Sequence, residues 1–413
     1  MSKQQVQTLK GFRDFLPTEK RKRDYVTKKV IETFEQFGFQ PLETPTLEYT
    51  SLLLGKYGDE ADKLVYNFKD RGDRAVALRY DQTVPVARVL TQYQSQLPRY
   101  FRRYQIQNVF RADKPQAGRY REFAQCDIDI FGTTSPLADA EIIACTYFSF
   151  VNVGFKNIKL KINDRQVLFA ALEPFVTKKV DVLSIIRSID KLDKLSSKKV
   201  AKELVKKGFT PKKAQSALEK IQQAKASNNL NEIIELSQQL GVPQESLVFT
   251  PTLARGLDYY TGMIFEVILP EYGSGSCGGG GRYDKLIDQL GGVDIPAVGI
   301  AFGFDRMVEA ADQLELIPQN GTGTQVLVTV FDKKYQAEST KTAFKLRQAG
   351  IKTELYPAAD NLSKQFKKAD QAKIPFAVVI GEEEVKNNQV SLKNLETGNQ
   401  KMVELNQIIR QLS

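Results

Sequence analysis

The residues most able to do chemistry lie between positions 110 and 132, in the segment FRADKPQAGRYREFAQCDIDIFG. From Arg119 to Asp129, polar and aromatic residues alternate with mostly apolar ones, which predicts a strand with one buried face. Guanidinium groups, an aromatic ring, an amide and carboxylates on one face suit a nucleotide phosphate, a stacking base and an ammonium group. A solvated hairpin with surface ion pairs is the alternative. The polar face comprises Arg119, Arg121, Phe123, Gln125, Asp127 and Asp129.

The chain contains no histidine. This excludes Ser-His-Asp triads, Cys-His pairs and zinc hydrolase sites built on imidazole. Chemistry must use carboxylates, arginines, backbone dipoles, groups of the substrate, or hard cations such as Mg²⁺ held by oxygen atoms. The three cysteines lie far apart without a CxxC pair, which argues against a disulfide framework or a thiolate zinc site.

Other elements must bring further polar groups to this strand. Asp81 and Thr83 stand between a predicted strand at 75–79 and a predicted helix at 84–93, where polar ligands are readily bound. Arg306 lies in the first turns of a helix that follows a predicted strand at 297–302, so it can reach a phosphate. The glycines at 278–281 lack the βαβ context of a dinucleotide loop, and we expect them to let backbone approach a ligand or another strand.

Length and charge indicate several domains and a nucleic-acid partner. The 413 residues favour two or three domains, and the formal net charge is +10. Residues 156–250 carry 18 Lys and Arg against 10 Asp and Glu, and residues 326–413 carry 14 against 10. This distribution fits an RNA-binding protein with a separate small-molecule site, and solvated lysine-rich helix faces would give the same counts. The N-terminus lacks a signal peptide and no apolar run could span a membrane, so we expect a cytoplasmic protein.

The pattern of elements predicts an α+β protein. Residues 1–164 and 249–322 are expected to form one core, interrupted at 165–248 by short lysine-rich helices. After the Gly-Thr-Gly-Thr linker at 321–324, alternating strands and helices predict a small α/β domain over 325–413.

Four motifs in order then closely resemble the histidyl-tRNA synthetases, a class II aminoacyl-tRNA synthetase family. They are the segment at 110–132, LARGLDYYTG at 253–262, GGGRYD at 279–284 and GFDR at 303–306, and the resemblance extends over essentially the whole chain. It implies a class II antiparallel catalytic sheet with flanking helices, a helical insertion domain and a C-terminal anticodon-binding domain. It also implies a homodimer that uses ATP with Mg²⁺ to activate histidine and transfers it to tRNA(His), with no protein-held metal.

The resemblance assigns roles by position. Arg111 and Arg255 are expected beside the α-phosphate and the histidine carboxylate, as the catalytic cations. Arg121 and Arg306 are expected to grip the ATP tail, with Phe123 under adenine. The histidine ammonium is expected near Asp81, Thr83, Gln125 and Asp129, and the histidine side chain among Tyr259, Tyr260 and Tyr283. Lys114 and Gln116 are expected to contact the tRNA acceptor end. Asp81 and Asp129 replace the glutamates of many bacterial members, so a shifted pocket is expected.

Two other interpretations compete with an active ligase. One is a catalytically silent paralogue, such as the regulatory subunit of ATP phosphoribosyltransferase. It is disfavoured because such proteins usually lack the C-terminal domain and the ATP-gripping arginines. The other is a non-catalytic basic RNA-binding protein, which would explain the charge but not the acidic and aromatic pocket residues.

Overall fold

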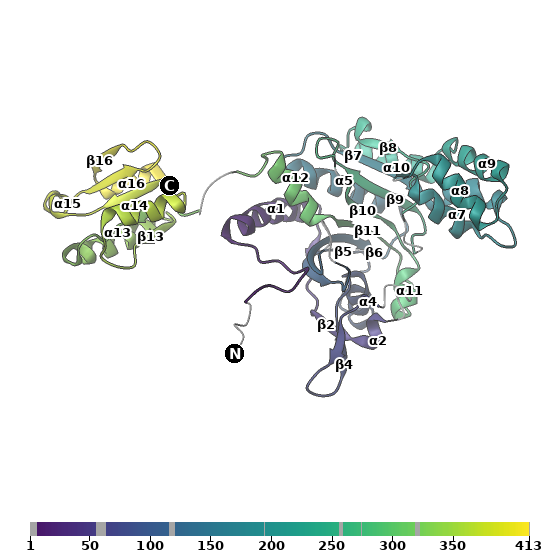
Figure 1. Cartoon of the computed structure of the whole chain (residues 1–413), viewed down its shortest axis with the longest axis horizontal. Helices are drawn as coiled ribbons and strands as arrows, with labels where there is room; N and C mark the ends of the chain where they lie inside the picture. Colours follow the sequence, from purple (N-terminus) through teal and green to yellow (C-terminus); the bar gives the residue numbers. More distant parts are fainter. Residues whose placement is uncertain are drawn as a thin grey trace. The chain divides into compact units, whose positions relative to one another are not determined.

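The computed structural model describes residues 6–54, 63–114, 120–193, 195–255, 259–273, 275–318 and 323–412 (Figure 1). The chain divides into two compact units, of which one comprises residues 1–14 and 22–317 and the other residues 15–21 and 318–413. None of the helices in the described ranges is long and apolar enough to cross a membrane.

An eight-stranded sheet forms the centre of the larger unit (Figure 1). Its six inner strands pair antiparallel, while the edge strands β1 and β8 pair parallel to their neighbours. The prediction of an α+β fold with a mostly antiparallel sheet is therefore confirmed. In spatial order the strands are β1 (Gln40–Pro41), β5 (Phe101–Phe110), β6 (Glu122–Phe131), β11 (Ala297–Phe302), β10 (Ser276–Arg282), β9 (Met263–Ile268), β7 (Lys159–Asp164) and β8 (Leu247–Phe249).

The period-two pattern of the segment at 110–132 is realised in β6, which pairs with β5 along its whole length. Cys126, Ile128 and Ile130 point into the main hydrophobic core, as the alternation predicts. The odd positions of β6 therefore face the other side of the sheet.

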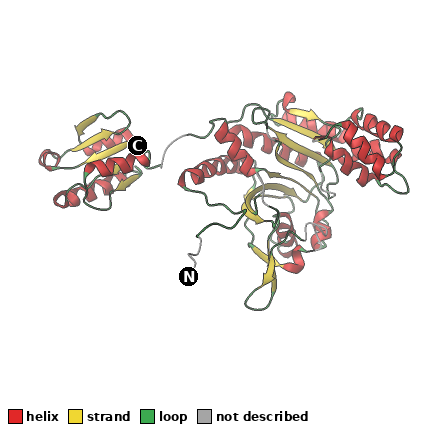
Figure 2. Cartoon of the chain, viewed as in Figure 1, coloured by secondary structure: helices red, strands yellow, loops and turns green. Residues whose placement is uncertain are grey.

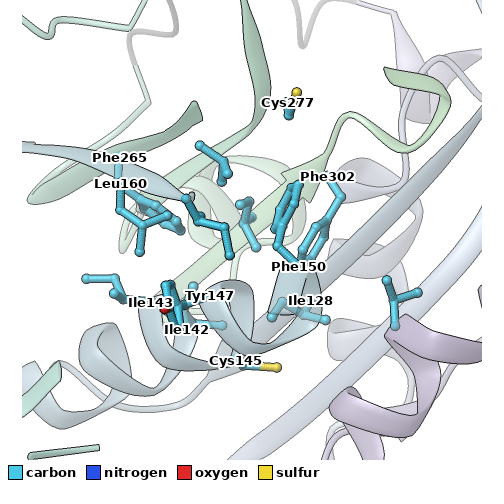
Figure 3. Packing of buried hydrophobic residues seen from close by; sticks show 14 of the residues in the cluster. Ile128, Ile142, Ile143, Cys145, Tyr147, Phe150, Leu160, Phe265, Cys277 and Phe302 are labelled. Atoms are coloured by element: carbon cyan, nitrogen blue, oxygen red, sulfur yellow. The ribbon is translucent and has the colours of Figure 1, made fainter. Parts of the chain in front are cut away.

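Helices cover the core face of this sheet. Helix α5 (Pro136–Val153) begins at Ser135, whose side chain accepts a hydrogen bond from the Leu137 amide, and ends at Gly154, where φ is +119°. Its Ile142, Ile143 and Phe150 pack against strand residues that include Phe302 (Figure 3). Helices α1 (Pro17–Gln36) and α12 (Phe304–Gln313) contribute further apolar residues to the same core.

Short helices fill the connection between β7 and β8 (Figure 1). Most of their buried residues join a second hydrophobic cluster, which also contains Ile264 of β9, Tyr260 and Tyr283. The helices at 165–222 thus pack against the same side of the sheet as the odd positions of β6 and support the polar site, whereas the helix at 228–239 packs against α5 on the core face. The helices are α6 (Arg165–Leu172), α7 (Val182–Ile189), α8 (Ser197–Lys207), α9 (Pro211–Gln222) and α10 (Asn228–Gln239).

A small antiparallel sheet and short helices complete the larger unit. Strand β4 (Ala75–Leu78) lies between β2 (Leu47–Tyr49) and β3 (Asn67–Lys69). Helix α4 begins directly after the Asp81 segment. The helices are α2 (Thr50–Leu53), α4 (Thr83–Gln92) and α11 (Leu286–Gly291).

The C-terminal unit is an α/β domain with its own core, as predicted (Figure 2). Its sheet has the order β13-β12-β14-β15-β16, in which β12 runs parallel to both neighbours and the last two strands form an antiparallel hairpin. The strands are β12 (Val326–Val328), β13 (Thr353–Leu355), β14 (Phe376–Val379), β15 (Val390–Asn394) and β16 (Gln400–Val403), and the helices are α13 (Gln336–Gln348), α14 (Leu362–Gln371), α15 (Glu382–Asn387) and α16 (Leu405–Leu412). The sequence did not predict α15, whose N-terminus is fixed when the Gly381 amide donates to Glu384 at 2.9 Å.

Candidate active site

Two rows of directly paired residues cross the sheet on the face opposite Cys126 and Ile128. Paired residues on adjacent strands point to the same side, so each row presents its side chains together. Small residues stand in the middle of both rows and leave room between the larger side chains that flank them. The first row is Gln105, Asp127, Ala301, Gly279, Glu266 and Lys161, and the second is Arg103, Asp129, Gly299, Gly281 and Ile264.

The glycines of these rows make room for functional side chains. A Cβ on Gly279 would lie 1.3 Å from Arg255 Nη1, and one on Gly299 would lie 1.8 Å from Asp129 Oδ1. A Cβ on Gly280 would instead lie 2.0 Å from the carbonyl oxygen of Gly299 on β11. The expectation that this glycine run permits a close approach to another strand is confirmed.

Two connected cavities of about 660 Å³ and 300 Å³ open above the rows. They share Tyr80, Arg111, Gln125, Arg255, Gly279 and Ala301, so a ligand can extend from one into the other. The larger cavity, here called the nucleotide compartment, is also lined by Tyr120, Phe123, Glu266, Ser276, Asp305 and Arg306. The smaller one, the amino-acid compartment, is also lined by Asp81, Thr83, Arg103, Asp127, Asp129, Tyr259, Tyr260 and Tyr283.

Arginines from three parts of the chain line the nucleotide compartment. The Arg111 guanidinium carbon lies 4.4 Å from the ring centre of Tyr80 and 5.1 Å from that of Phe123. Arg111 Nε donates to the Tyr80 carbonyl at 3.1 Å. Arg306 Nη1 donates to the Ser276 carbonyl at 2.7 Å. Because a guanidinium matches the planar oxygen pairs of phosphates and carboxylates, this compartment suits a polyanion beside an aromatic ring.

Arg255 reaches the boundary of the two compartments from a left-handed backbone conformation, with φ at +44°. Non-glycine residues adopt this conformation rarely, and it is common at functional sites. Its guanidinium crosses Gly279 and donates from Nη1 to Glu266 Oε1 at 3.1 Å. The charge of Arg255 is thereby placed between the two compartments.

Two buried aspartates and Arg103 form the base of the amino-acid compartment. Arg103 Nη2 lies 2.5 Å from Asp129 Oδ2, and the Tyr283 hydroxyl donates to Asp129 Oδ1. Asp127 is only 4% exposed, and its Oδ1 has no hydrogen-bond partner among the described residues. Burial raises the pKa of Asp127 to about 8, against the opposing effect of Arg103. A cationic group of a ligand would therefore stabilise the ionised form of the Asp127 carboxyl.

Tyrosines form the wall of the amino-acid compartment. The rings of Tyr259 and Tyr260 are 4.7 Å apart, and Tyr283 meets Tyr259 edge-on at 5.9 Å. Burial raises the pKa of Tyr259 and Tyr283 well above the usual value, so both hydroxyls remain protonated donors near neutral pH. At the rim, Asp81 Oδ1 accepts a hydrogen bond from the Val84 amide at 3.2 Å and caps the first turn of α4, where Thr83 stands.

Most of the site residues named from the sequence come together here. Of the residues predicted from the sequence, those that line one or both compartments are Asp81, Thr83, Arg111, Phe123, Gln125, Asp129, Arg255, Tyr259, Tyr260, Tyr283 and Arg306. Arg121 lines neither compartment, and its guanidinium donates to the Asp113 and Lys10 carbonyls at 3.0 and 3.4 Å. Lys114 is exposed outside both compartments, and Gln116 lies outside the described residues.

Three functional candidates were assigned no role from the sequence. Asp127 stands on the predicted polar face of β6, and that position was the available signal. Arg103 and Glu266 reach the site through strand pairing over long sequence separations, which residue spacing along the chain does not reveal. Among the described ranges, no group of three or more His, Cys, Asp or Glu is placed to hold a metal ion.

Comparison with known proteins connects this geometry to one family. The histidyl-tRNA synthetase family model matches residues 11–307, and the anticodon binding domain model matches residues 325–413. The histidine–tRNA ligase of Cytophaga hutchinsonii is 38% identical over 450 residues, covering 98% of each chain. The crystal structure of histidyl-tRNA synthetase from Nostoc sp. PCC 7120 superposes with a TM-score of 0.87 and 30% identity, over 99% of this chain and 100% of that one. A Bacillus halodurans protein described as an ATP phosphoribosyltransferase regulatory subunit/histidyl-tRNA synthetase shares the fold, with a TM-score of 0.75, 21% identity and coverage of 92% of this chain and 99% of that one.

Proposed function

The chain belongs to the histidyl-tRNA synthetase family, and from this premise we propose how its residues divide the work of histidine–tRNA ligation. The protein is a histidine–tRNA ligase, an aminoacyl-tRNA synthetase, and this family uses ATP. The observation that supports the assignment of residues is the pair of connected compartments, which meet at Arg111, Gln125 and Arg255. One is lined by Phe123 and Arg306, and the other by three aspartates and four tyrosines.

In the first step, the histidine carboxylate attacks the α-phosphorus of ATP, a new P–O bond forms, and diphosphate leaves with the electrons of the broken bond. The nucleophile is already ionised, so no protein base is required, and an enzyme without histidine can catalyse the step. Arg111 and Arg255 border both compartments and stabilise the charge that builds on the phosphate oxygens. Phe123 stacks on adenine and Arg306 binds the phosphate tail.

Arg121 is assigned to the ATP tail only by its position in the motif. Its guanidinium donates to the backbone carbonyls of Asp113 and Lys10, so we propose that Arg121 first orders these two segments beside the nucleotide. A direct contact with ATP would require its guanidinium to exchange one of these carbonyls for a phosphate oxygen.

In the amino-acid compartment, we assign the histidine ammonium to Asp81, Thr83 and Gln125, with Asp127 as an additional carboxylate. Asp129 pairs with Arg103 and, with Tyr283, borders the imidazole. Tyr259 and Tyr260 complete the wall. A cation beside Asp127 would offset the cost of burying its charge.

Mg²⁺ is proposed to enter with ATP. It prefers oxygen ligands, keeps several waters and is commonly bound through substrate phosphates with one or two carboxylates. The described acids fit that pattern, since they include single carboxylates near the nucleotide compartment and no cluster of three. When bound, the ion would neutralise charge on the phosphate oxygens.

In the second step, a ribose hydroxyl at the tRNA 3′ end attacks the histidyl carbonyl, and AMP leaves. We propose that a phosphate oxygen of the adenylate accepts the hydroxyl proton. Lys114 and Gln116 are proposed to contact the acceptor end, and the C-terminal α/β domain is proposed to bind the anticodon. A cytoplasmic location is proposed because translation consumes the product there.

A homodimer is also proposed, with the three-stranded sheet near the contact. Tyr49 and Phe68 flank Val76 on that sheet and are 59% and 48% exposed, and Leu47 is 44% exposed. Exposed apolar groups gathered in this way are typical of interfaces. Light scattering should give twice the chain mass, and the chain mass alone would contradict this proposal.

Histidine-dependent exchange of diphosphate into ATP tests the function. The purified chain should catalyse this exchange with histidine and should then charge tRNA(His). A protein that binds histidine or RNA without exchange would support a silent regulatory subunit or an RNA-binding protein instead. Both are disfavoured by the arginines of the nucleotide compartment and by the ligase relatives that match nearly full length.

A further inference from the structure

We propose that Glu266 is a positioning residue for Arg255: its carboxylate holds the guanidinium across Gly279, at the junction of the nucleotide and amino-acid compartments. The inference rests on the role proposed above for Arg255 and adds the group that fixes that side chain in place. Neither the sequence pattern nor the family motif assigns a role to Glu266.

The geometry leaves Arg255 few other anchors. Its backbone is in the left-handed region, and Nη1 lies 3.1 Å from Glu266 Oε1 and 3.5 Å from the Phe265 carbonyl oxygen. Both acceptors belong to β9, a strand inside the sheet. A long side chain that must hold one orientation needs such a rigid partner, because each free rotamer lowers the population of the reactive one.

The strand pairing places Glu266 opposite a glycine, the residue type that permits the Arg255 guanidinium to reach Glu266. Glu266 pairs directly with Gly279 on β10, and the absence of a Cβ there lets the guanidinium lie on the strand. On the other side Glu266 pairs with Lys161, which itself lies 3.7 Å from Asp193. Arg255 is therefore the cation in hydrogen-bonding contact with Glu266 among the described residues.

The Glu266 carboxylate is mostly removed from water, with a side-chain exposure of 18%. Burial raises its pKa, and Arg255 opposes that change, as expected for a charge that depends on its partner. The arrangement holds the Arg255 side chain in one orientation before substrates arrive. Such preorganisation lowers the barrier because little reorganisation is left for the reaction itself.

The competing assignment for a carboxylate beside the nucleotide compartment is a Mg²⁺ ligand. The two roles predict different kinetics. A positioning residue acts through Arg255, so its loss has no further effect once Arg255 is gone. A metal ligand acts independently of Arg255, and its loss raises the Mg²⁺ concentration required.

The test is a double-mutant cycle on the full chain with Arg255→Ala, Glu266→Gln and both together, assayed by histidine-dependent diphosphate exchange. Glu271→Gln is the matched control, since Glu271 is an exposed acid just after β9. We expect Glu266→Gln to lower kcat about 10- to 100-fold with KM for histidine and ATP changed less than about threefold. Glu266→Asp should retain more activity than Glu266→Gln because it keeps the charge.

The double variant should be no slower than Arg255→Ala alone, which is the signature of one shared interaction. Losses that multiply, or activity of Glu266→Gln that returns at high Mg²⁺, would overturn the inference. Glu266→Gln activity equal to that of the control would overturn it as well. An inactive unsubstituted chain would instead refute the proposed function, and thermal unfolding identifies any variant whose loss comes from misfolding.

Discussion

Substituting Gly279 by alanine should remove most activity while leaving the fold almost intact. The added Cβ would lie 1.3 Å from Arg255 Nη1, and an ordinary contact of about 3.4 Å requires the guanidinium to move by about 2 Å. A misplacement of about 1 Å can cost about 100-fold in rate. We therefore expect kcat to fall at least about 100-fold, which corresponds to about 2.7 kcal/mol of transition-state stabilisation.

The neighbouring Gly280 provides the matched comparison. Its added Cβ would meet the Gly299 carbonyl oxygen at 2.0 Å, a backbone atom that cannot move without distorting β11. Gly280→Ala should therefore lower the free energy of unfolding by several kcal/mol, whereas Gly279→Ala displaces only the end of a flexible side chain and should cost less than about 1.5 kcal/mol.

Diphosphate exchange and thermal unfolding measured on both variants separate the two effects. The account requires an inactive but stable Gly279→Ala protein and an unstable Gly280→Ala protein. A Gly279→Ala enzyme with a near-normal kcat would refute the argument that Arg255 acts from its position across this strand.

Two further substitutions probe the amino-acid compartment. Gly299→Ala would place a Cβ 1.8 Å from Asp129 Oδ1 and 2.6 Å from the Ile128 carbonyl oxygen, so it should displace this carboxylate from Arg103 and also lower the free energy of unfolding. In the folded variant the Kd for histidine should rise about tenfold or more while KM for ATP changes little; equal changes in both would contradict the division into compartments. Because the pKa of Asp127 is raised to about 8, its ionised fraction grows from about one tenth at pH 7 to one half at pH 8, and histidine affinity measured by calorimetry should rise about fivefold over this interval. Asp127→Asn should abolish that rise. Between pH 4 and 8 the folded state binds more protons at Asp127 than the unfolded state, so the free energy of unfolding of the unsubstituted, unliganded protein falls as pH rises. Asp127→Asn should remove this fall and should therefore be more stable than the unsubstituted protein toward pH 8.

The order of elements in both units could be predicted from the sequence because hydrophobic periodicity and caps are local signals. The alternation along β6 indicated which side chains face the core, and the Asp81 segment was correctly placed at the start of a helix. Short elements such as α15 depend on a single capping side chain, Glu384, and were not predicted.

The contacts between charged side chains across the central sheet could not be predicted in the same way. Which carboxylate pairs with Arg103, and which acid holds Arg255, depends on strand register between segments more than 10 residues apart. The need for glycine at 279 and 299 can be explained only once the side chain that lies against each is known. Sequence motifs thus named most of the residues that line the two compartments, and the tertiary structure added Arg103, Asp127 and Glu266 beside them.

The central claim is that Arg255 serves the transition state of histidine activation. Its most direct test is Arg255→Ala, with histidine binding measured by calorimetry and adenylate formation measured by histidine-dependent diphosphate exchange. The account predicts that exchange falls at least about 100-fold while the Kd for histidine changes less than about threefold. Equal losses of binding and exchange would contradict it, because Arg255 would then support only ground-state binding.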